Sequence, residues 1–521
     1  MMSGPGFVEG LMQPRPLLIK GLVERAEALF GGREVVARTE QGVERSSYAD
    51  VVVRARRLAS ALQRAGVRPG DRVATFAWND ARHFELYLAV PAMGAVLHTL
   101  NIRLSEEDLR YIVEHAGDKA IFLDASLAGA LPRVEGVAFE VVMSGDASVR
   151  EGARDYEAFL AEGDPAFVFP DVPEDAAAAM CYTSGTTGRP KGVVYSQRST
   201  VLHSLVAAQV DVLGIAERDS IMPVVPMFHA NAWGIPYAAA MCGARLVLPG
   251  PRPTAADLAQ LIAAEGVTKA AGVPTVWQDV AQLSPAPQLG GLREIICGGS
   301  AVSESLIRTY DERFGVPIVQ AWGMTEMSPV GSVSRPGADS APADEVRLRA
   351  LQGTPVPLVQ ARIDAATGGE LQVAGPWVAA AYYGEPPGED KFTGDGWLRT
   401  GDVAELVEGR YIRLVDRTKD LIKTGGEWIS SVELENHIVA HPAVREAAVI
   451  AIPDERWGER PCACVVLQED ATLDAEGLRE FLSDRVARWW IPDRIELIDA
   501  VPRTTVGKYD KKVLRARYAE S

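Results

Sequence analysis

Strand and helix patterns alternate through the first part of this 521-residue chain, and no other feature constrains its fold as strongly. Residues 48–65 and 82–93 have helical spacing, and the apolar segment 72–77 between them is typical of a strand. Ser105-Glu-Glu-Asp108 resembles a capping box that opens a helix ending at His115. The alternation continues with strands expected at 120–124, 292–297 and 316–320 and helices at 257–265 and 303–314. This order predicts an α/β fold in which layers of helices cover largely parallel sheets.

The character of the sequence changes near Gln352. Short β segments such as 370–373 and 411–415 lie there between glycine- and proline-containing turns, which indicates a small β subdomain. The residues after Asp416 are typical of a compact α+β unit of about 100 residues. We therefore expect a large N-terminal domain at 1–415, a linker at 416–421 and a small C-terminal domain at 422–521.

Composition excludes several classes of protein. Hydrophobic residues make up 47 % of the chain and charged residues 24 %, which is ordinary for a folded globular protein and excludes a mostly disordered or fibrous chain. The 53 basic and 70 acidic side chains give a net charge of −17. Because a nonspecific nucleic-acid binder needs a basic face, no nucleic-acid partner is expected.

The five cysteines do not predict a disulfide framework, because their number is odd and their density is low. Cys462-Ala-Cys464 is a close pair, but neither a second such pair nor a histidine cluster accompanies it, which disfavours a metal site. The spacing of two residues fits one face of a strand instead.

Neither a signal peptide nor a membrane span is expected. Residues 1–30 contain no apolar core followed by a small-residue cleavage site. Residues 220–244 carry no formal charge, but prolines and polar residues interrupt them, which a spanning helix tolerates poorly. The interrupting residues are Pro223, Pro226, Pro236, His229 and Asn231. We interpret the stretch as a buried strand-and-loop segment, and we expect a cytoplasmic protein without stable membrane insertion.

The strongest candidate for a binding site is the segment Tyr182-Thr-Ser-Gly-Thr-Thr-Gly-Arg-Pro-Lys-Gly192. Its glycines let backbone N–H groups approach an anion, its hydroxyl groups add donors, and Lys191 adds a positive charge. The ending of a Walker A loop is missing. The alternative is a solvated turn, which the density of hydroxyls, glycines and a lysine disfavours. The residues predicted to hold phosphates are Thr183, Ser184, Gly185, Thr186, Thr187, Gly188 and Lys191.

This segment resembles the signature loop of the adenylate-forming superfamily, which contains acyl-CoA synthetases, luciferases and the adenylation domains of peptide synthetases. Further motifs follow in the order of that family and cover nearly the whole chain. They are Trp322-Gly-Met-Thr-Glu326, Trp397-Leu-Arg-Thr-Gly-Asp402, the segment 416–427 and Pro502-Arg-Thr-Thr-Val-Gly-Lys508. The resemblance implies layered α/β subdomains and a small β subdomain that bind ATP and the acid, followed by a small, mobile α+β C-terminal domain.

The resemblance also implies an AMP-forming ligase that activates a carboxylic acid with ATP and passes the acyl group to coenzyme A. Catalysis of this kind consists mainly of positioning and of positive charge around the α-phosphate. Lys508 is implied to bridge the acid and the α-phosphate, and Thr325 to offer that phosphate a hydroxyl group. Glu326, together with Thr186, is implied to hold Mg²⁺, which prefers hard oxygen ligands. His229 is expected near the carboxylate of the acid.

The nucleotide and coenzyme A contacts are assigned by the same resemblance. An ionised aspartate only accepts hydrogen bonds, which suits the ribose hydroxyls. The expected adenosine contacts are Asp402 and Arg417 at the ribose and Gly298, Gly299, Ser300, Trp322, Gly323 and Met324 around the base. The expected contacts in the second half-reaction are Lys423, Gly425, Gly426, Glu427 and Trp428, after the C-terminal domain has rotated about Lys419.

The acid itself is less constrained. Residues 226–236 resemble the segment of medium- and long-chain fatty acyl-CoA synthetases in which a tryptophan, here Trp233, gates an acyl tunnel. The alternative is that Trp233 simply packs in the core. Because relatives that activate short thioether or aryl acids share the motif, such an acid is the alternative substrate.

A nucleotide-binding pseudoenzyme is the rival from another class, and intact Glu326, Asp402, Arg417 and Lys508 disfavour it. The sequence carries no carrier-protein domain after Lys508, which favours a free-standing ligase that uses soluble coenzyme A. By resemblance we also expect a homodimer, with the arm before Ile19 as an oligomer contact.

Overall fold

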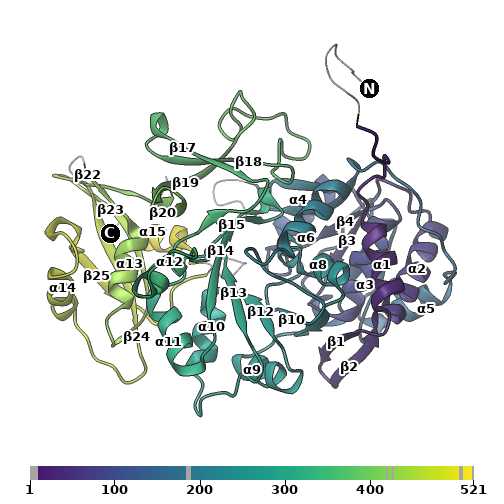
Figure 1. Cartoon of the computed structure of the whole chain (residues 1–521), viewed down its shortest axis with the longest axis horizontal. Helices are drawn as coiled ribbons and strands as arrows, with labels where there is room; N and C mark the ends of the chain where they lie inside the picture. The colour runs from purple at the N-terminus through teal and green to yellow at the C-terminus, as the bar shows by residue number, and fades with distance from the viewer. Residues whose placement is uncertain (1–9, 184–188, 418–419, 425–426, 504–508, 519–521) are drawn as a thin grey trace.

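The structure is a computed structural model, and it describes residues 10–183, 189–417, 420–424, 427–503 and 509–518 (Figure 1). Within these ranges the strands form four sheets, two of them large. The first large sheet has the spatial order β16 (Thr354–Pro355), β15 (Val330–Val333), β14 (Ile318–Gly323), β13 (Glu294–Gly298), β12 (Lys269–Gly272), β10 (Ser220–Pro223), β11 (Arg245–Leu248), β1 (Glu34–Thr39) and β2 (Gly42–Ser47). The second has the order β7 (Arg154–Asp155), β6 (Phe139–Val142), β5 (Asp118–Leu123), β3 (Arg72–Phe76), β4 (Val96–Thr99), β8 (Ala177–Tyr182) and β9 (Gly192–Ser196).

The inner strands of both large sheets run parallel, and helices cover both of their faces. One apolar cluster fills the space between the sheets, and helices on the outer faces bury separate clusters. The helices between the sheets are α1 (Ile19–Phe30), α2 (Tyr48–Arg64), α3 (Ala81–Ala92), α5 (Tyr156–Ala161), α6 (Gln197–Ala207) and α8 (Ile235–Cys242). The outer helices are α9 (Ala255–Ala264), α10 (Pro274–Ala281) and α11 (Glu304–Phe314) on the first sheet and α4 (Glu106–Ala116) on the second.

Side chains alternate between these clusters along a strand, as the pleat requires. In β1, Val35 and Ala37 belong to the cluster between the sheets, whereas Val36 belongs to the cluster under the outer helices. Strands that are apolar on both faces are typical of a parallel sheet with helices on either side. The expected α/β layering is therefore confirmed.

Two smaller sheets follow the large ones. The β subdomain contains β17 (Gln360–Asp364), β18 (Glu370–Ala374), β19 (Leu398–Val407) and β20 (Tyr411–Arg417) and is antiparallel throughout. The C-terminal sheet has the order β22 (Glu427–Ile429), β21 (Ile422–Thr424), β24 (Gly458–Leu467) and β23 (Val444–Asp454), with β25 (Arg494–Leu497) beside β24. The remaining helices are α12 (Glu345–Arg349), α13 (Ser431–Val439), α14 (Ala475–Ser483) and α15 (Lys511–Tyr518).

The C-terminal sheet is buried on both faces. Leu434 of α13 and Leu478 of α14 pack on one face, and Leu514 of α15 packs on the other. Cys462 and Cys464 share the second face, as the spacing of two predicted. An α+β C-terminal part after a β subdomain agrees with the expected fold class. The boundaries at 415 and 421 stay predictions, and β20 continues through the first two residues of the predicted linker.

The stretch 220–244 was predicted to be strand and loop, and the second half of that prediction is wrong. After β10 the chain forms the short left-handed turn labelled α7 (Ala230–Trp233) and then the helix α8, which has Pro236 in its first turn. Proline is tolerated there because the first helical N–H groups have no partner within the helix. Among the helices that the structure describes, none is long and apolar enough to cross a membrane.

The loop between β3 and α3 ties the two large sheets together. The side-chain amide of Asn79 donates to the carbonyl oxygens of Pro223 and Val225, each at 2.9 Å. Its Oδ1 accepts the N–H of Met227 at 2.7 Å. Three hydrogen bonds from one buried side chain thus fix the segment that leads from β10 to His229.

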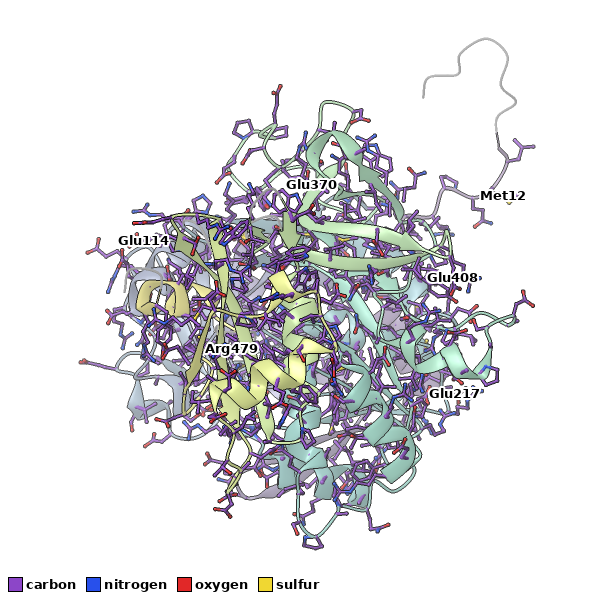
Figure 2. All side chains as sticks on the ribbon, turned by 90° about the vertical axis from the view of Figure 1, so that its left-hand side faces the viewer. Met12, Glu114, Glu217, Glu370, Glu408 and Arg479 are labelled. Carbon is purple, nitrogen blue, oxygen red and sulfur yellow. The ribbon has the colours of Figure 1, made fainter. Side chains whose placement is uncertain are left out.

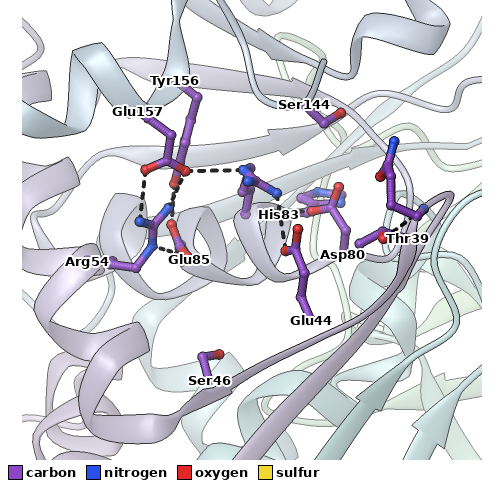
Figure 3. Close-up of polar contacts among 12 residues, drawn as sticks. Thr39, Glu44, Ser46, Arg54, Asp80, His83, Glu85, Ser144, Tyr156 and Glu157 are labelled. Carbon is purple, nitrogen blue, oxygen red and sulfur yellow. Dashed lines mark hydrogen bonds and ion pairs between the residues drawn. The ribbon is translucent and has the colours of Figure 1, made fainter.

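The next residue, Asp80, caps the N-terminus of α3, where its carboxylate accepts the N–H of His83 at 2.7 Å. Burial raises the pKa of Asp80 to about 7, and burial lowers the pKa of His83 to about 4. Figure 3 shows this pair close to an ion-pair cluster in which Arg54 lies between Glu85 and Glu157. Glu85 carries a further negative charge that opposes ionisation of Asp80.

Replacing Asp80 by asparagine should make folding stability less dependent on pH. The carboxyl group titrates near 3.8 in the unfolded chain and near 7 in the native state, so stability is lost as pH rises through this window. Three pH units correspond to about 4 kcal/mol, and asparagine is an equally good N-cap. We expect Asp80→Asn to gain more melting temperature over the wild type at pH 8 than at pH 5. A difference between the two melting temperatures that is constant with pH would contradict the raised pKa.

Candidate active site

The motif Trp322-Gly-Met-Thr-Glu326 begins at the end of β14, at the edge where the parallel strands of the first sheet end. Trp322 Nε1 donates to Asp402 Oδ2 at 3.2 Å, which joins two motifs that are 80 residues apart in the sequence. Asp402 lies opposite Arg417 in the pairing of β19 with β20, and Arg417 Nε is 3.5 Å from Asp402 Oδ1. Three of the residues predicted to contact adenosine are therefore neighbours.

Glycine is required at positions 323 and 298 because the backbone of a neighbouring segment lies very close to each of them. A Cβ atom on Gly323 would lie 1.7 Å from the carbonyl oxygen of Pro329, where the pairing of β14 with β15 shifts register. A Cβ atom on Gly298 would lie 2.5 Å from the carbonyl oxygen of Ala321 and 3.4 Å from the ring of Trp233. The turn after β13, with Gly299 half-buried and Ser300 exposed, thus lies directly against β14 and against Trp233. Trp233 belongs to residues 226–236, which are predicted to line the acyl tunnel and are called the acyl segment below.

Thr325 and Glu326, which follow the end of β14, are both buried. Tyr195 donates its hydroxyl to the carbonyl oxygen of Thr325 at 2.7 Å. Tyr382 donates its hydroxyl to Glu326 Oε1 at 2.7 Å, and Ala379 N–H donates to the Glu326 carbonyl oxygen at 2.7 Å. Both residues are therefore held by neighbours from other elements.

A carboxylate in this position fits the role of a magnesium ligand. The described ranges contain no cluster of three or more His, Cys, Asp or Glu side chains that could hold an ion by themselves. Magnesium is usually bound by one or two carboxylates, together with water and substrate phosphates. Glu326 therefore fits as one protein ligand of an ion that arrives with a nucleotide.

The predicted phosphate loop is closed at its base by the hairpin of β8 and β9. Thr183 N–H donates to the Lys191 carbonyl oxygen at 2.9 Å, and Lys191 N–H donates to Thr183 Oγ1 at 3.3 Å. The Lys191 ammonium group lies 2.9 Å from Glu385 Oε2 and 4.8 Å from the ring centroid of Tyr382. Ser184, Gly185, Thr186, Thr187 and Gly188 lie outside the described residues.

The acyl segment after β10 contains a left-handed turn. The φ angles of Ala230, Asn231, Ala232 and Trp233 run from 43° to 58°, and that of Gly234 is 72°. L-amino acids disfavour this conformation by roughly 1–2 kcal/mol per residue. The turn is buried, the Cys181 thiol donates to Asn231 Oδ1 at 3.4 Å, and Gly234 N–H donates to the Asn231 carbonyl oxygen at 3.0 Å.

The turn places Trp233, which is 6 % exposed, against Gly298, and it begins at the half-buried His229. Met324 packs at the edge of the same apolar cluster as Trp233. The acyl segment therefore meets the predicted base site, although the sequence separates them by more than sixty residues.

The predicted coenzyme A residues do not join this group. Lys423, Glu427 and Trp428 are exposed on β21 and β22, where Lys423 Nζ lies 4.8 Å from the ring centroid of Trp428. In Figure 1, β22 lies at the left-hand edge, whereas β14 and β15 lie in the middle. The predicted residues Lys419, Gly425, Gly426 and Lys508 lie outside the described ranges.

Several residues that organise the site cannot be recognised from the sequence alone. Asn79 and Tyr195 anchor backbone carbonyl groups from other elements, and Tyr382 and Glu385 contact Glu326 and Lys191. None of the four belongs to the motifs quoted above. The aromatic pair Tyr382-Tyr383 precedes the motif that ends at Asp402, but such a pair is equally typical of a packed loop.

Comparison with known protein families identifies the family of this chain. The family model described as "AMP-binding enzyme" matches residues 23–383, and the one described as "AMP-binding enzyme C-terminal domain" matches residues 433–508. This chain belongs to the AMP-binding enzyme family. The match includes the phosphate loop, Trp322 and Glu326 in its first part and Lys508 at the end of its second.

Curated relatives match almost end to end. The chain is 46 % identical to a long-chain-fatty-acid–CoA ligase of Thermus thermophilus, covering 97 % of this chain and 96 % of the relative. It is 44 % identical to a medium-chain-fatty-acid–CoA ligase of Ectopseudomonas oleovorans, covering 98 % of each. It is also 44 % identical to a 3-methylmercaptopropionyl-CoA ligase of Ruegeria pomeroyi, covering 98 % of this chain and 99 % of the relative.

Solved structures share the fold. A crystal structure of an anthranilate CoA ligase in complex with anthranoyl-AMP superposes with a TM-score of 0.87 at 23 % identity, covering 97 % of this chain and 98 % of that chain. Together with the relatives, family membership confirms the expected AMP-forming acid–coenzyme A ligase, which uses a carboxylic acid, ATP, Mg²⁺ and coenzyme A. The pseudoenzyme alternative is thereby disfavoured further.

Adding one methyl group at Gly323 should disrupt the nucleotide side of the site. The new Cβ would overlap the Pro329 carbonyl oxygen, so β14 and β15 must separate. We expect Gly323→Ala to lower the melting temperature and to weaken ATP binding at least about tenfold, an increment of roughly 1.4 kcal/mol. Gly291→Ala is the matched control, because a Cβ there meets no atom within 4 Å. Wild-type ATP affinity in Gly323→Ala, measured by calorimetry, would contradict this account.

Proposed function

We propose that this ligase activates a medium- to long-chain fatty acid, forming the acyl-adenylate and then the coenzyme A thioester. The observation that carries the proposal is the contact of Trp233 with Gly298, beside the motif that begins at Trp322. It puts a large apolar side chain next to the place predicted for the nucleotide. The names of the relatives from Thermus thermophilus and Ectopseudomonas oleovorans support the same class of acid.

The composition of the acyl segment favours an apolar acid. Residues 226–236 contain no charged side chain apart from a protonatable His229. Met227, Phe228 and Ile235 are buried there together with Trp233. A second carboxylate on the substrate would be left without a counter-ion from this wall, and burying an unpaired charge is costly.

Within this proposal each predicted site residue has one role. Lys191 and the phosphate loop hold the β- and γ-phosphates, Glu326 holds Mg²⁺, and Thr325 contacts the α-phosphate. Asp402 and Arg417 hold the ribose, and His229 lies near the acid carboxylate. Lys508 stabilises the charge that develops at the α-phosphate during adenylation. Positive charge and positioning are the main sources of catalysis in such an adenylyl-group transfer, in which the acid carboxylate attacks the α-phosphorus of ATP and pyrophosphate leaves.

The second half-reaction is proposed to follow a rotation of the C-terminal domain about Lys419. The exposed position of Lys423, Glu427 and Trp428, away from β14 and β15, supports this proposal, because these residues need a different domain arrangement to meet the acyl group. Domain rotations of this kind depend on a few residues that absorb the change in backbone angles.

A cytoplasmic homodimer is proposed as the working form. Leu11 and Met12 are 89 % and 85 % exposed on an arm that leads away from the rest of the molecule (Figure 2). A second copy that packs on this arm would bury both side chains and remove their apolar surface from water. The arm therefore supports a contact between two copies.

A panel of straight-chain acids from acetate to palmitate, with a cinnamate and a 3-methylthio acid added, tests the substrate class. Thioester formation by the wild type should be fastest with medium or long chains. Trp233→Ala should shift the preferred chain length, with the KM for ATP changed less than about twofold. If the methylthio acid is preferred, the alternative suggested by the Ruegeria pomeroyi relative replaces the proposal. If Trp233→Ala only lowers the melting temperature, Trp233 is a core residue and not a gate.

Lys508→Ala should separate the half-reactions. A cation about 4 Å from a developing negative charge is worth roughly 4 kcal/mol at an effective dielectric constant of 20. We expect adenylate formation to slow by on the order of 10²–10³ or more. Conversion of supplied acyl-adenylate and coenzyme A to thioester should fall far less. The measurements are pyrophosphate release and thioester formation on one preparation, and equal loss of both would refute the assignment.

A further inference from the structure

One side chain, Tyr382, contacts both groups that the nucleotide is expected to need. Its hydroxyl end donates to Glu326 Oε1 at 2.7 Å. The face of its ring lies 4.8 Å from the Lys191 ammonium group. Tyr382 is 6 % exposed and lies in the loop between β18 and β19, so it belongs to neither of the elements that carry Glu326 and Lys191.

The segment around Tyr382 is itself fixed against the stem of the phosphate loop. Tyr383 N–H donates to the carbonyl oxygen of Gly192 at 2.8 Å. Two residues further along, Glu385 forms an ion pair with Lys191 at 2.9 Å. The backbone on either side of the Tyr382 ring therefore follows the hairpin of β8 and β9, and the ring position is set by the hairpin.

The kind of contact matters because Glu326 and Lys191 have opposite charges. A direct ion pair between them would leave less charge for a metal ion and for phosphate. A neutral hydroxyl donor satisfies one oxygen of the buried Glu326 carboxylate without cancelling its charge. A phenol carries its proton at neutral pH, so the Tyr382 hydroxyl is the donor in this hydrogen bond.

The ring of Tyr382 contacts the second charged group, the Lys191 ammonium. A cation over an aromatic face is attracted by the ring quadrupole without losing its charge. Lys191 is about 40 % exposed, so its ammonium group stays accessible to an incoming anion. The Glu385 pair is solvent-exposed, and exposed pairs of this kind are weak and readily exchanged.

We propose that Tyr382 is a positioning residue for metal-dependent nucleotide binding, which orients Glu326 through its hydroxyl group and keeps Lys191 apart from it through its ring. The proposal rests on the proposed role of Glu326 as a magnesium ligand. The proposal can be tested at one hydroxyl group. Phenylalanine at position 382 would keep the ring and its contact with Lys191 but would lose the hydrogen bond to Glu326.

The test is calorimetric titration of the full-length protein with ATP, once in Mg²⁺ and once in EDTA. Tyr382→Phe should weaken binding in Mg²⁺ at least about tenfold, as expected for a lost hydrogen bond to a charged group, and should change binding in EDTA less than about twofold. The Mg²⁺ concentration that half-saturates pyrophosphate release should rise by a similar factor. Melting curves confirm that the variants are folded.

Tyr383→Phe is the matched control, because it removes the same hydroxyl group one residue along, where the ring packs against His115 with the centroids 5.6 Å apart. Its binding constants should stay within twofold of the wild type. Wild-type Mg²⁺ dependence in Tyr382→Phe would overturn the proposal, and so would an equal loss in Mg²⁺ and EDTA, because the effect would then not involve the metal.

Glu326→Gln separates this proposal from the one on which it rests. If Glu326 holds the metal, this variant should lose the Mg²⁺-dependent part of ATP affinity. Tyr382→Phe should then have no further effect in the Glu326→Gln background, as a double-mutant cycle would show. If Glu326→Gln binds ATP as the wild type does, the assignment of the metal ligand fails. If the effects of the two substitutions on ATP affinity add, Tyr382 does not act through Glu326. That result would refute the positioning role of Tyr382 even if Glu326 is the metal ligand.

Discussion

The close approach of the backbone at Gly323 to the carbonyl oxygen of Pro329 is the constraint on which the rest of the site depends. β15 returns antiparallel along β14 there, with a shift in register that only a residue without a side chain permits. The shift directs Trp322 toward Asp402 and buries the Thr325 and Glu326 that follow. The packing between two strands thus explains why a glycine occupies position 323 of the predicted nucleotide-binding motif.

Apart from Asp402 and Arg417 on the antiparallel strands β19 and β20, the predicted site residues around β14 lie at the ends of parallel strands or just after them. Gly298 ends β13, Trp322 lies at the end of β14, Thr183 follows β8, and His229 lies in the loop after β10. Ligands of open α/β sheets bind outside the carboxyl ends of the strands, and here the ends of two separate sheets converge. Asn79 helps to hold that convergence, because it extends from the second sheet to the backbone after β10 in the first.

Local sequence patterns were sufficient to predict helices and strands whose ends are marked by their own capping and turn residues. The helix at 303–314 has its cap at Ser303 and ends before the left-handed Gly315, and both features are written in neighbouring residues. The stretch 220–244 was misread in its second half because its helix is apolar all round, so the polar face that marks a surface helix is absent.

Within the site, motifs predicted which residues matter, but not how they are held. Trp322 and Asp402 could each be singled out from their motifs, whereas their hydrogen bond depends on how β19 packs beside β14. Tyr382 and Asn79 could not be singled out, because a tyrosine or an asparagine in a loop has many uses and only its distant partners distinguish one use from another. Contacts across long sequence separations leave no local pattern.

The left-handed turn at 230–234 limits which amino acids can replace those present in it. Four consecutive residues with side chains occupy a backbone region that β-branched residues almost never adopt, so valine, isoleucine and threonine are poor candidates at each of them. Glycine, asparagine and unbranched side chains are the accessible neighbours in sequence space. Changes in acid selectivity that begin at the proposed acyl wall can therefore use only a few amino acids at these four positions. Combinatorial libraries aimed at new acids would gain by randomising the surrounding helices instead.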